Sequence, residues 1–120
     1  SIGRRCAEVY QKHRDLFEAY LPALKALGAA GWQPVPHARI EGAPKVIVER
    51  FGPTQGQVYL TVLNLGEQQS GALTVDWQAL GATGVGSARE LLTGARVDLD
   101  QPLSLGAGKL MVLQLDLLGM

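Results

Sequence analysis

The sequence predicts a mainly β protein, an antiparallel β-sandwich preceded by one N-terminal amphipathic helix. After residue 44, short runs rich in β-branched and aliphatic residues follow one another, separated by turn-rich segments, and 11 of the 15 glycines of the chain lie in this part. No second helical pattern interrupts these runs. Consecutive strands with short connections favour antiparallel pairing over a βαβ arrangement, and we expect five to seven or more of them.

The helix is predicted over residues 1–31. Apolar and aromatic positions recur there at steps of three and four, which is the spacing of one helix face. They are Ile2, Cys6, Val9, His13, Leu16 and Tyr20, with a neighbouring row of Phe17, Leu21, Leu24 and Leu27. Because Pro22 lacks an amide hydrogen and its ring crowds the preceding turn, we expect the helix to be kinked or broken near it.

The rest of the chain divides into a connection and a sandwich. Residues 32–44 contain several prolines, which bias the residues before them toward extended structure, and predict a linker or entry strand. Residues 45–120 form the predicted sandwich. Its strands are expected at 45–51, 57–65, 72–77, 85–92 and 109–117, with weaker pieces at 97–99 and 102–105. The run 57–65 is apolar on both faces, so we expect it to be a central strand.

Composition excludes several partners. Lys plus Arg number 11 and Asp plus Glu number 11, so the formal net charge is zero, and no basic cluster indicates a nucleic-acid partner. No apolar run approaches the roughly 20 residues that span a bilayer. The first residues lack the pattern of a signal peptide. We expect a soluble protein or a piece of one, with no membrane partner and no assigned compartment.

Neither a metal centre nor a cofactor is predicted. His13 and His37 are isolated, with no second ligand at a spacing that would place two side chains on one face. Cys6, the single cysteine, has no visible activating base and is interpreted as a small apolar residue of the helix.

No catalytic residue is predicted either. Glycoside hydrolysis needs a pair of carboxylates across the scissile bond. Asp98 and Asp100 alternate along an expected short strand, whereas Glu49, Asp76 and Glu90 stand singly. We interpret all five as solvated surface charges.

Three aromatic residues are weak candidates for sugar binding. Trp32, Tyr59 and Trp77 have rings on which a sugar could stack. Packing in the core or at a domain interface is the alternative for each of them.

Two stretches resemble parts of glycoside hydrolases. Residues 14–22 and the sequence Ala30-Gly31-Trp32-Gln33-Pro34-Val35 resemble the last helix of a catalytic (β/α)8 barrel and the crossover that follows it. The C-terminal β-sandwich domain that follows such barrels is resembled by residues 46–51, 58–65, Arg89-Glu90-Leu91-Leu92-Thr93-Gly94, 103–105 and 109–115. The resemblance implies a parent glycosidase whose catalytic carboxylates lie on barrel strands that this chain does not include.

The leading hypothesis is therefore a non-catalytic accessory domain that packs against the barrel of its parent. A carbohydrate-binding module and a free-standing interaction domain are the alternatives. The apolar row that includes Leu16, Phe17, Leu21 and Leu24 must be covered, since burying one such side chain is worth about 1.5–3 kcal/mol. We expect the helix to fold back onto its own sandwich, with a homodimer through the helix as the second arrangement.

Overall fold

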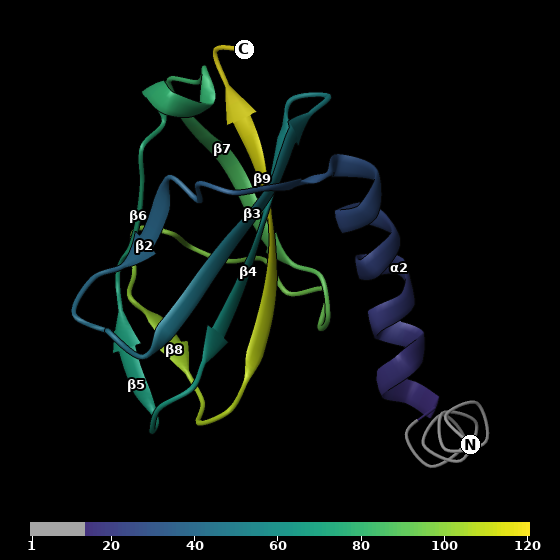
Figure 1. Ribbon diagram of the computed structural model, residues 1–120, viewed down its shortest axis with the longest axis vertical. Helices are drawn as coiled ribbons and strands as arrows, with labels where there is room; N and C mark the ends of the chain where they lie inside the picture. The colour runs from purple at the N-terminus through teal and green to yellow at the C-terminus, as the bar shows by residue number, and fades with distance from the viewer. Residues whose placement is uncertain (1–13) are drawn as a thin grey trace.

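The computed structural model describes residues 14–120, so the predicted helical positions Ile2, Cys6, Val9 and His13 lie outside the described residues. The described part is a mainly β, antiparallel sandwich that follows one α-helix, which confirms the predicted fold class (Figure 1). The elements are α2 (Arg14–Ala30), β1 (Trp32–Gln33), β2 (Ala38–Ile40), β3 (Val46–Thr54), β4 (Gln57–Asn64), β5 (Gln69–Gly71), β6 (Leu73–Val75), the 3₁₀ turn η1 (Gln78–Leu80), β7 (Gly84–Glu90), β8 (Leu103–Leu105) and β9 (Leu110–Leu118).

The strands form two layers. The larger layer is a five-stranded sheet in the order β1-β3-β4-β9-β7, in which every neighbouring pair is antiparallel. The other layer consists of the pairs β2–β6 and β5–β8. Strand β4 lies between β3 and β9, so the central position expected for the doubly apolar run 57–65 is confirmed.

The main core lies between the two layers. Val58, Leu60 and Val62 of β4 are fully buried there, together with Leu113 and Leu115 of β9. The second layer contributes the buried side chains of Ile40, Leu103 and Leu105. Alternate residues of a strand point to opposite faces, so these β4 residues leave Tyr59, Thr61 and Leu63 for the other face of the sheet.

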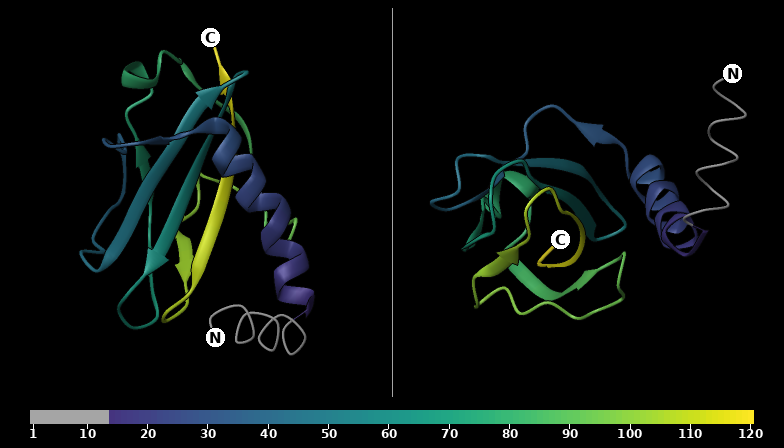
Figure 2. Two further views of the ribbon diagram at one scale, coloured as in Figure 1. Left: turned by 45° about the vertical axis from the view of Figure 1, so that its right-hand side comes forward. Right: turned by 90° about the horizontal axis from the view of Figure 1, so that it is seen from below.

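Helix α2 covers part of that other face. Ala23 and Leu27 of the helix are buried against Tyr59 of β4 and Val112 of β9. The expectation that the helix packs on its own sandwich is therefore met. Figure 2 shows the helix lying against the outer surface of the five-stranded sheet, while Figure 1 shows its N-terminal end leaning away from the strands.

Helix α2 continues through Pro22 as one helix, so the break expected near this residue is not observed, and a kink there stays a prediction. Pro22 is exposed. The buried neighbours Ala23 and Leu27 hold the helix by tertiary packing, which outweighs the loss of one backbone hydrogen bond.

The expected apolar row is also only partly correct. Leu21 and Leu24 are exposed, and the helix instead presents the smaller residues Ala23, Ala26 and Ala30 to the sheet together with Leu27. Small side chains let the helix approach the strands closely. The side chains of Leu16 and Phe17 lie outside the described part of the chain.

One further expectation needs correction. Residues 97–99 do not form a strand, and only an isolated bridge between Arg89 and Arg96 attaches this region to β7. For residues 32–44 a linker or an entry strand was expected, and the segment contains two strands: β1, which pairs with β3, and β2, which pairs with β6. The sequence signal also missed β5, which lies in a segment predicted to be a turn.

Candidate functional site

An apolar groove separates the leaning half of α2 from the sheet. Its volume is about 400 Å³. The strand side is built from two rows of paired residues on the outer face. Ile47 pairs with Leu63 and Leu63 with Leu110 in one row, and Glu49 pairs with Thr61 and Thr61 with Val112 in the other. Ala23, Leu24 and Leu27 line the helix side. The groove exists because the helix contacts the sheet near its C-terminal end and diverges from it toward its N-terminal end.

Large apolar side chains are open to solvent at this groove. Leu24 is 54% exposed on the helix and Ile47 is 46% exposed on β3, and both line the groove. Single exposed aliphatic residues are common on proteins, but residues that converge on one concave surface mark interaction sites. This surface, which we call the α2–β3 groove, is the candidate functional site.

One charged side chain lines the α2–β3 groove. Glu49 of β3 lies between Ile47 and Phe51 on the outer face, and it pairs with Thr61 across the sheet. Among residues 14–120 its carboxylate makes no ion pair and no hydrogen bond. An apolar surface with a single unpaired carboxylate is complementary to an apolar surface that carries one basic side chain.

The opposite end of the same sheet face is polar. The carboxylate of Asp116 on β9 accepts hydrogen bonds from Ser87 Oγ at 2.6 Å and from Gln57 Nε2 at 2.8 Å. Tyr59 OH donates to Gln57 Oε1 at 3.1 Å. The bonds from Ser87 and Gln57 hold the pKa of Asp116 below its usual range. The outer face therefore changes along the strands from a bonded polar network to the open apolar groove.

The three aromatic candidates do not form one platform. Trp32 and Tyr59 lie in one row of the outer face, because each pairs with Phe51. Trp32 is 56% exposed, whereas Tyr59 is buried under α2. Trp77 packs against the main core on the other side of the sheet. Trp32 is therefore the one candidate whose ring is mostly free, and stacking on it remains a prediction.

Glu90 is not a surface charge, which corrects the sequence interpretation. Its carboxylate is buried and accepts the backbone N–H of Thr93 and that of Val112, each at 2.8 Å. Gly94 N–H closes the turn onto the Glu90 carbonyl at 2.9 Å. The Glu90-Leu91-Leu92-Thr93-Gly94 motif is thus a side-chain-stabilised turn at the end of β7, and Leu91 and Leu92 pack beside α2.

The other carboxylates singled out in the sequence are exposed, as expected. Asp98 and Asp100 lie in a turn rather than on a strand, and Asp98 Oδ1 accepts the Asp100 N–H at 2.9 Å. Asp76 Oδ1 accepts the N–H of Ala79 at 3.1 Å, at the start of η1. Within residues 14–120 no group of three His, Cys, Asp or Glu side chains could hold a metal ion.

Sequence reasoning missed two buried polar residues. Asn64 is fully buried at the end of β4, and Arg50 is buried on β3. Arg50 Nε donates to the Val35 carbonyl at 3.0 Å and its Nη1 donates to the Gly52 carbonyl. Burial lowers the pKa of this guanidinium from its ordinary value. A charged residue inside an apolar strand is a usable signal, but its carbonyl partners cannot be read from the sequence.

These features define a class of protein: an antiparallel β-sandwich with one helix packed on the outer face of its larger sheet and an apolar groove beside that helix. Comparison with known proteins finds a similar solved structure but no similar sequence. No protein-family model matches the chain, and no curated protein matches its sequence significantly. No described helix is long and apolar enough to cross a membrane.

Among solved structures, the fold is similar to part of a "putative α-N-acetylgalactosaminidase" from Bacillus halodurans, with a TM-score of 0.50 and 12% sequence identity. The match covers 64% of this chain and 19% of that one. At this identity the similarity concerns the fold alone. In that protein the matching fold is a small part of a much longer chain.

Proposed function

We propose that this chain is a non-catalytic accessory β-sandwich of a longer glycoside hydrolase, and that it packs against the catalytic (β/α)8 barrel of its parent through the α2–β3 groove. The observation that carries the proposal is the convergence of Leu24 and Ile47, both about half exposed, on one concave apolar surface. Exposure of such a surface to water is unfavourable, and its burial under a partner lowers the free energy.

Two further observations support the identity of the partner. The motifs of residues 30–35 and 90–94 resemble those that join and build the sandwich behind a barrel, and the similar fold in the Bacillus halodurans protein occupies 19% of its chain. The partner surface that fits the groove is apolar with one basic side chain opposite Glu49. The outer helices of a barrel can supply such a surface.

The non-catalytic part of the proposal rests on how the described carboxylates are used. Both carboxylate oxygens of Glu90 accept hydrogen bonds from backbone N–H groups, and Glu49 is a single charge in an apolar groove. Neither forms the pair of carboxylates that glycoside hydrolysis needs. A carbohydrate-binding module built on stacked aromatic rings is less well supported, since Tyr59 and Trp77 are packed.

The test compares one substitution in two contexts. In this chain alone, Leu24→Asp should change the free energy of unfolding by no more than about 0.5 kcal/mol, because the side chain is mostly exposed. In the longer natural chain the same change should cost at least about 2 kcal/mol, because a charge would be buried in the interface. Urea unfolding followed by fluorescence measures both.

Leu65→Asp is the matched control, because Leu65 is 61% exposed and lies outside the groove. It should be neutral in both contexts. Equal effects of Leu24→Asp in the two contexts would overturn the docking proposal, as would a longer natural chain that contains no barrel.

A further inference from the structure

Strand β3 has a free edge over its first half. On one side it pairs with β4 along its length, but on the other side β1 pairs only with Arg50 and Phe51. Residues 46–49 therefore form an edge of the five-stranded sheet to which no described strand is bonded. Figure 1 shows the stretch that contains β1 crossing β3 near its upper end, which leaves the lower end uncovered among the described residues.

The main-chain groups of Val46 and Val48 point out of this edge. The Lys45 carbonyl accepts the Leu65 N–H at 3.0 Å, so Lys45 faces β4. Since successive residues of a strand direct their main-chain groups to opposite sides, residues 46 and 48 face the free side. The Val46 N–H already binds the Ala43 carbonyl at 3.1 Å. In the described part of the chain, the Val46 carbonyl and both main-chain groups of Val48 are left for a further strand.

The side chains along this edge are complementary to their own reversed order. Lys45, Ile47 and Glu49 alternate along the outer face of β3, and all three are exposed. Read in the opposite direction, this order of basic, apolar and acidic residues becomes acidic, apolar and basic. An antiparallel copy of the same strand therefore places an opposite charge across from each charge, and an apolar side chain across from Ile47.

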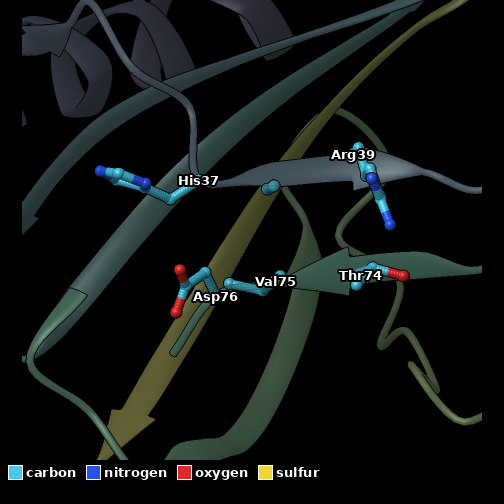
Figure 3. A pocket seen from close by; sticks show the side chains of 6 residues that line it. His37, Arg39, Thr74, Val75 and Asp76 are labelled. Atoms are coloured by element: carbon cyan, nitrogen blue, oxygen red, sulfur yellow. The ribbon is translucent and has the colours of Figure 1, made fainter. Parts of the chain in front are cut away.

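The charges on the second layer are already paired, which distinguishes them from those of the β3 edge. Arg39 of β2 lies opposite Thr74 of β6, and Figure 3 shows their side chains at the same end of this strand pair. Arg39 Nη2 binds Glu41 Oε1 at 2.8 Å, and Thr74 Oγ1 donates to the same oxygen at 3.2 Å. Within residues 14–120, the side chains of Lys45 and Glu49 form no ion pair. Both charges are thus available to a second molecule.

We propose that the free edge of β3 pairs with the same edge of a second copy of this chain, antiparallel and around a two-fold axis at Ile47. In this register Lys45 of each copy lies opposite Glu49 of the other, and the two Ile47 side chains meet at the axis. The Val48 N–H of each copy donates to the Val46 carbonyl of the other. Two main-chain hydrogen bonds and two ion pairs then join the sheets of the two copies.

Strand β1 excludes the neighbouring register. With Val48 opposite Val48, Val46 would lie opposite Arg50, whose free side is already occupied by Gln33 of β1. The two-fold axis at Ile47 instead confines the contact to residues 45–49, where the edge is open. This pairing does not rest on docking to a barrel. Because Glu49 belongs to both surfaces, the test uses this chain alone, where no barrel competes for the carboxylate.

The test is sedimentation equilibrium of the chain, residues 1–120. Because contact between two strand edges buries little surface, we expect a monomer–dimer equilibrium with a dissociation constant on the order of 10–100 µM. Glu49→Lys places two lysines opposite each other at each end of the contact, and Lys45→Glu places two glutamates there. Each variant alone should raise the dissociation constant at least about tenfold. An equimolar mixture of the two variants should dimerise again, because every lysine then faces a glutamate of the other variant.

Asp100→Lys is the matched control, because it reverses the charge of an exposed residue that lies beside β7, at the opposite edge of the sheet. It should leave the dissociation constant unchanged. A chain that stays monomeric throughout the expected range overturns the proposal, as does a mixture of the two charge variants that does not associate. A dimer that is lost in Leu24→Asp but kept in Glu49→Lys would also overturn it, because the contact would then lie on the helix.

Discussion

At the scale of single residues, Asn64 joins segments that are distant in sequence. Its Nδ2 donates to the carbonyls of Glu67, Leu105 and Gly106 at 2.8, 3.0 and 3.1 Å. Its Oδ1 accepts from Gly66 N–H and from Gln69 Nε2, both at 2.9 Å. One fully buried amide thus fixes the loop after β4 to the loop between β8 and β9. In the sequence it is an isolated polar residue at the end of an apolar run, and partners 41 and 42 residues away cannot be inferred from it.

Asn64→Asp should therefore lower the free energy of unfolding by at least about 2 kcal/mol. Aspartate keeps the shape of the side chain but replaces the donor with an acceptor that faces three carbonyl oxygens. Gln68→Glu is the same chemical change at an exposed position and should stay within about 0.5 kcal/mol. Urea unfolding of both variants measures the difference, and equal effects would show that the amide network contributes little.

At the scale of elements, the sequence predicted those strands whose apolar pattern decides their place. The runs 45–51, 57–65, 72–77, 85–92 and 109–117 each overlap an observed strand, because period-two alternation against one core is a local signal. The pairing of β4 with β9 is not local and was not predicted.

The elements that were missed depend on contacts outside themselves. Strand β5 consists of Gln69, Ser70 and Gly71, with no apolar pattern. Gly71 is required there because a Cβ atom would lie 2.6 Å from the Glu41 carbonyl oxygen and 2.7 Å from Ile40 Cγ2. Close approach of two backbones defines this strand, and a turn-forming composition conceals it. The segment 97–99 is the reverse case, since its alternation indicated a strand but Asp98 closes a turn instead.

Helix α2 is positioned by its small residues, and the candidate groove follows from that. Sequence periodicity indicated the helix, yet it favoured the large leucines as the buried side, whereas Ala23 is 2% exposed and Leu24 is 54% exposed. A large residue facing the strands would lift the helix from the sheet. Periodicity alone cannot distinguish the face that meets the chain's own sheet from a face left for a partner.

Ala23→Leu should consequently destabilise the protein by about 1–3 kcal/mol through overpacking between α2 and the sheet. Ala29→Leu makes the same change on the exposed side of the same helix, and it should have an effect within about 0.5 kcal/mol. The midpoint of urea unfolding, followed by circular dichroism at 222 nm, compares the two. If both variants behaved alike, the helix would not be held by the contact of Ala23 with the sheet.

At the scale of the whole molecule, the helix and the sandwich belong to two different hydrophobic clusters. The main core contains residues of every described strand from Ala38 onward except β5, and it does not include α2. The helix belongs to the second cluster, with Tyr59 and Val112. The predicted sandwich of residues 45–120 omits β1 and β2, which pair with β3 and β6. The smallest folding unit should therefore begin near residue 32.

Two truncated chains test this boundary. A chain of residues 32–120 loses α2 and exposes Tyr59 and Val112, but it keeps the main core, so it should fold with lower stability and bind a dye for apolar surfaces. A chain of residues 45–120 also loses the buried Ile40, worth about 1.5–3 kcal/mol, and the Val35 carbonyl that Arg50 requires. Because a buried guanidinium that keeps only the Gly52 carbonyl as a partner adds a further penalty of about 1–3 kcal/mol, this shorter chain should not fold. Dispersed amide spectra for residues 32–120 and collapsed spectra for residues 45–120 are expected. Dispersed spectra for both would place the boundary at residue 45 and reduce β1 and β2 to a linker.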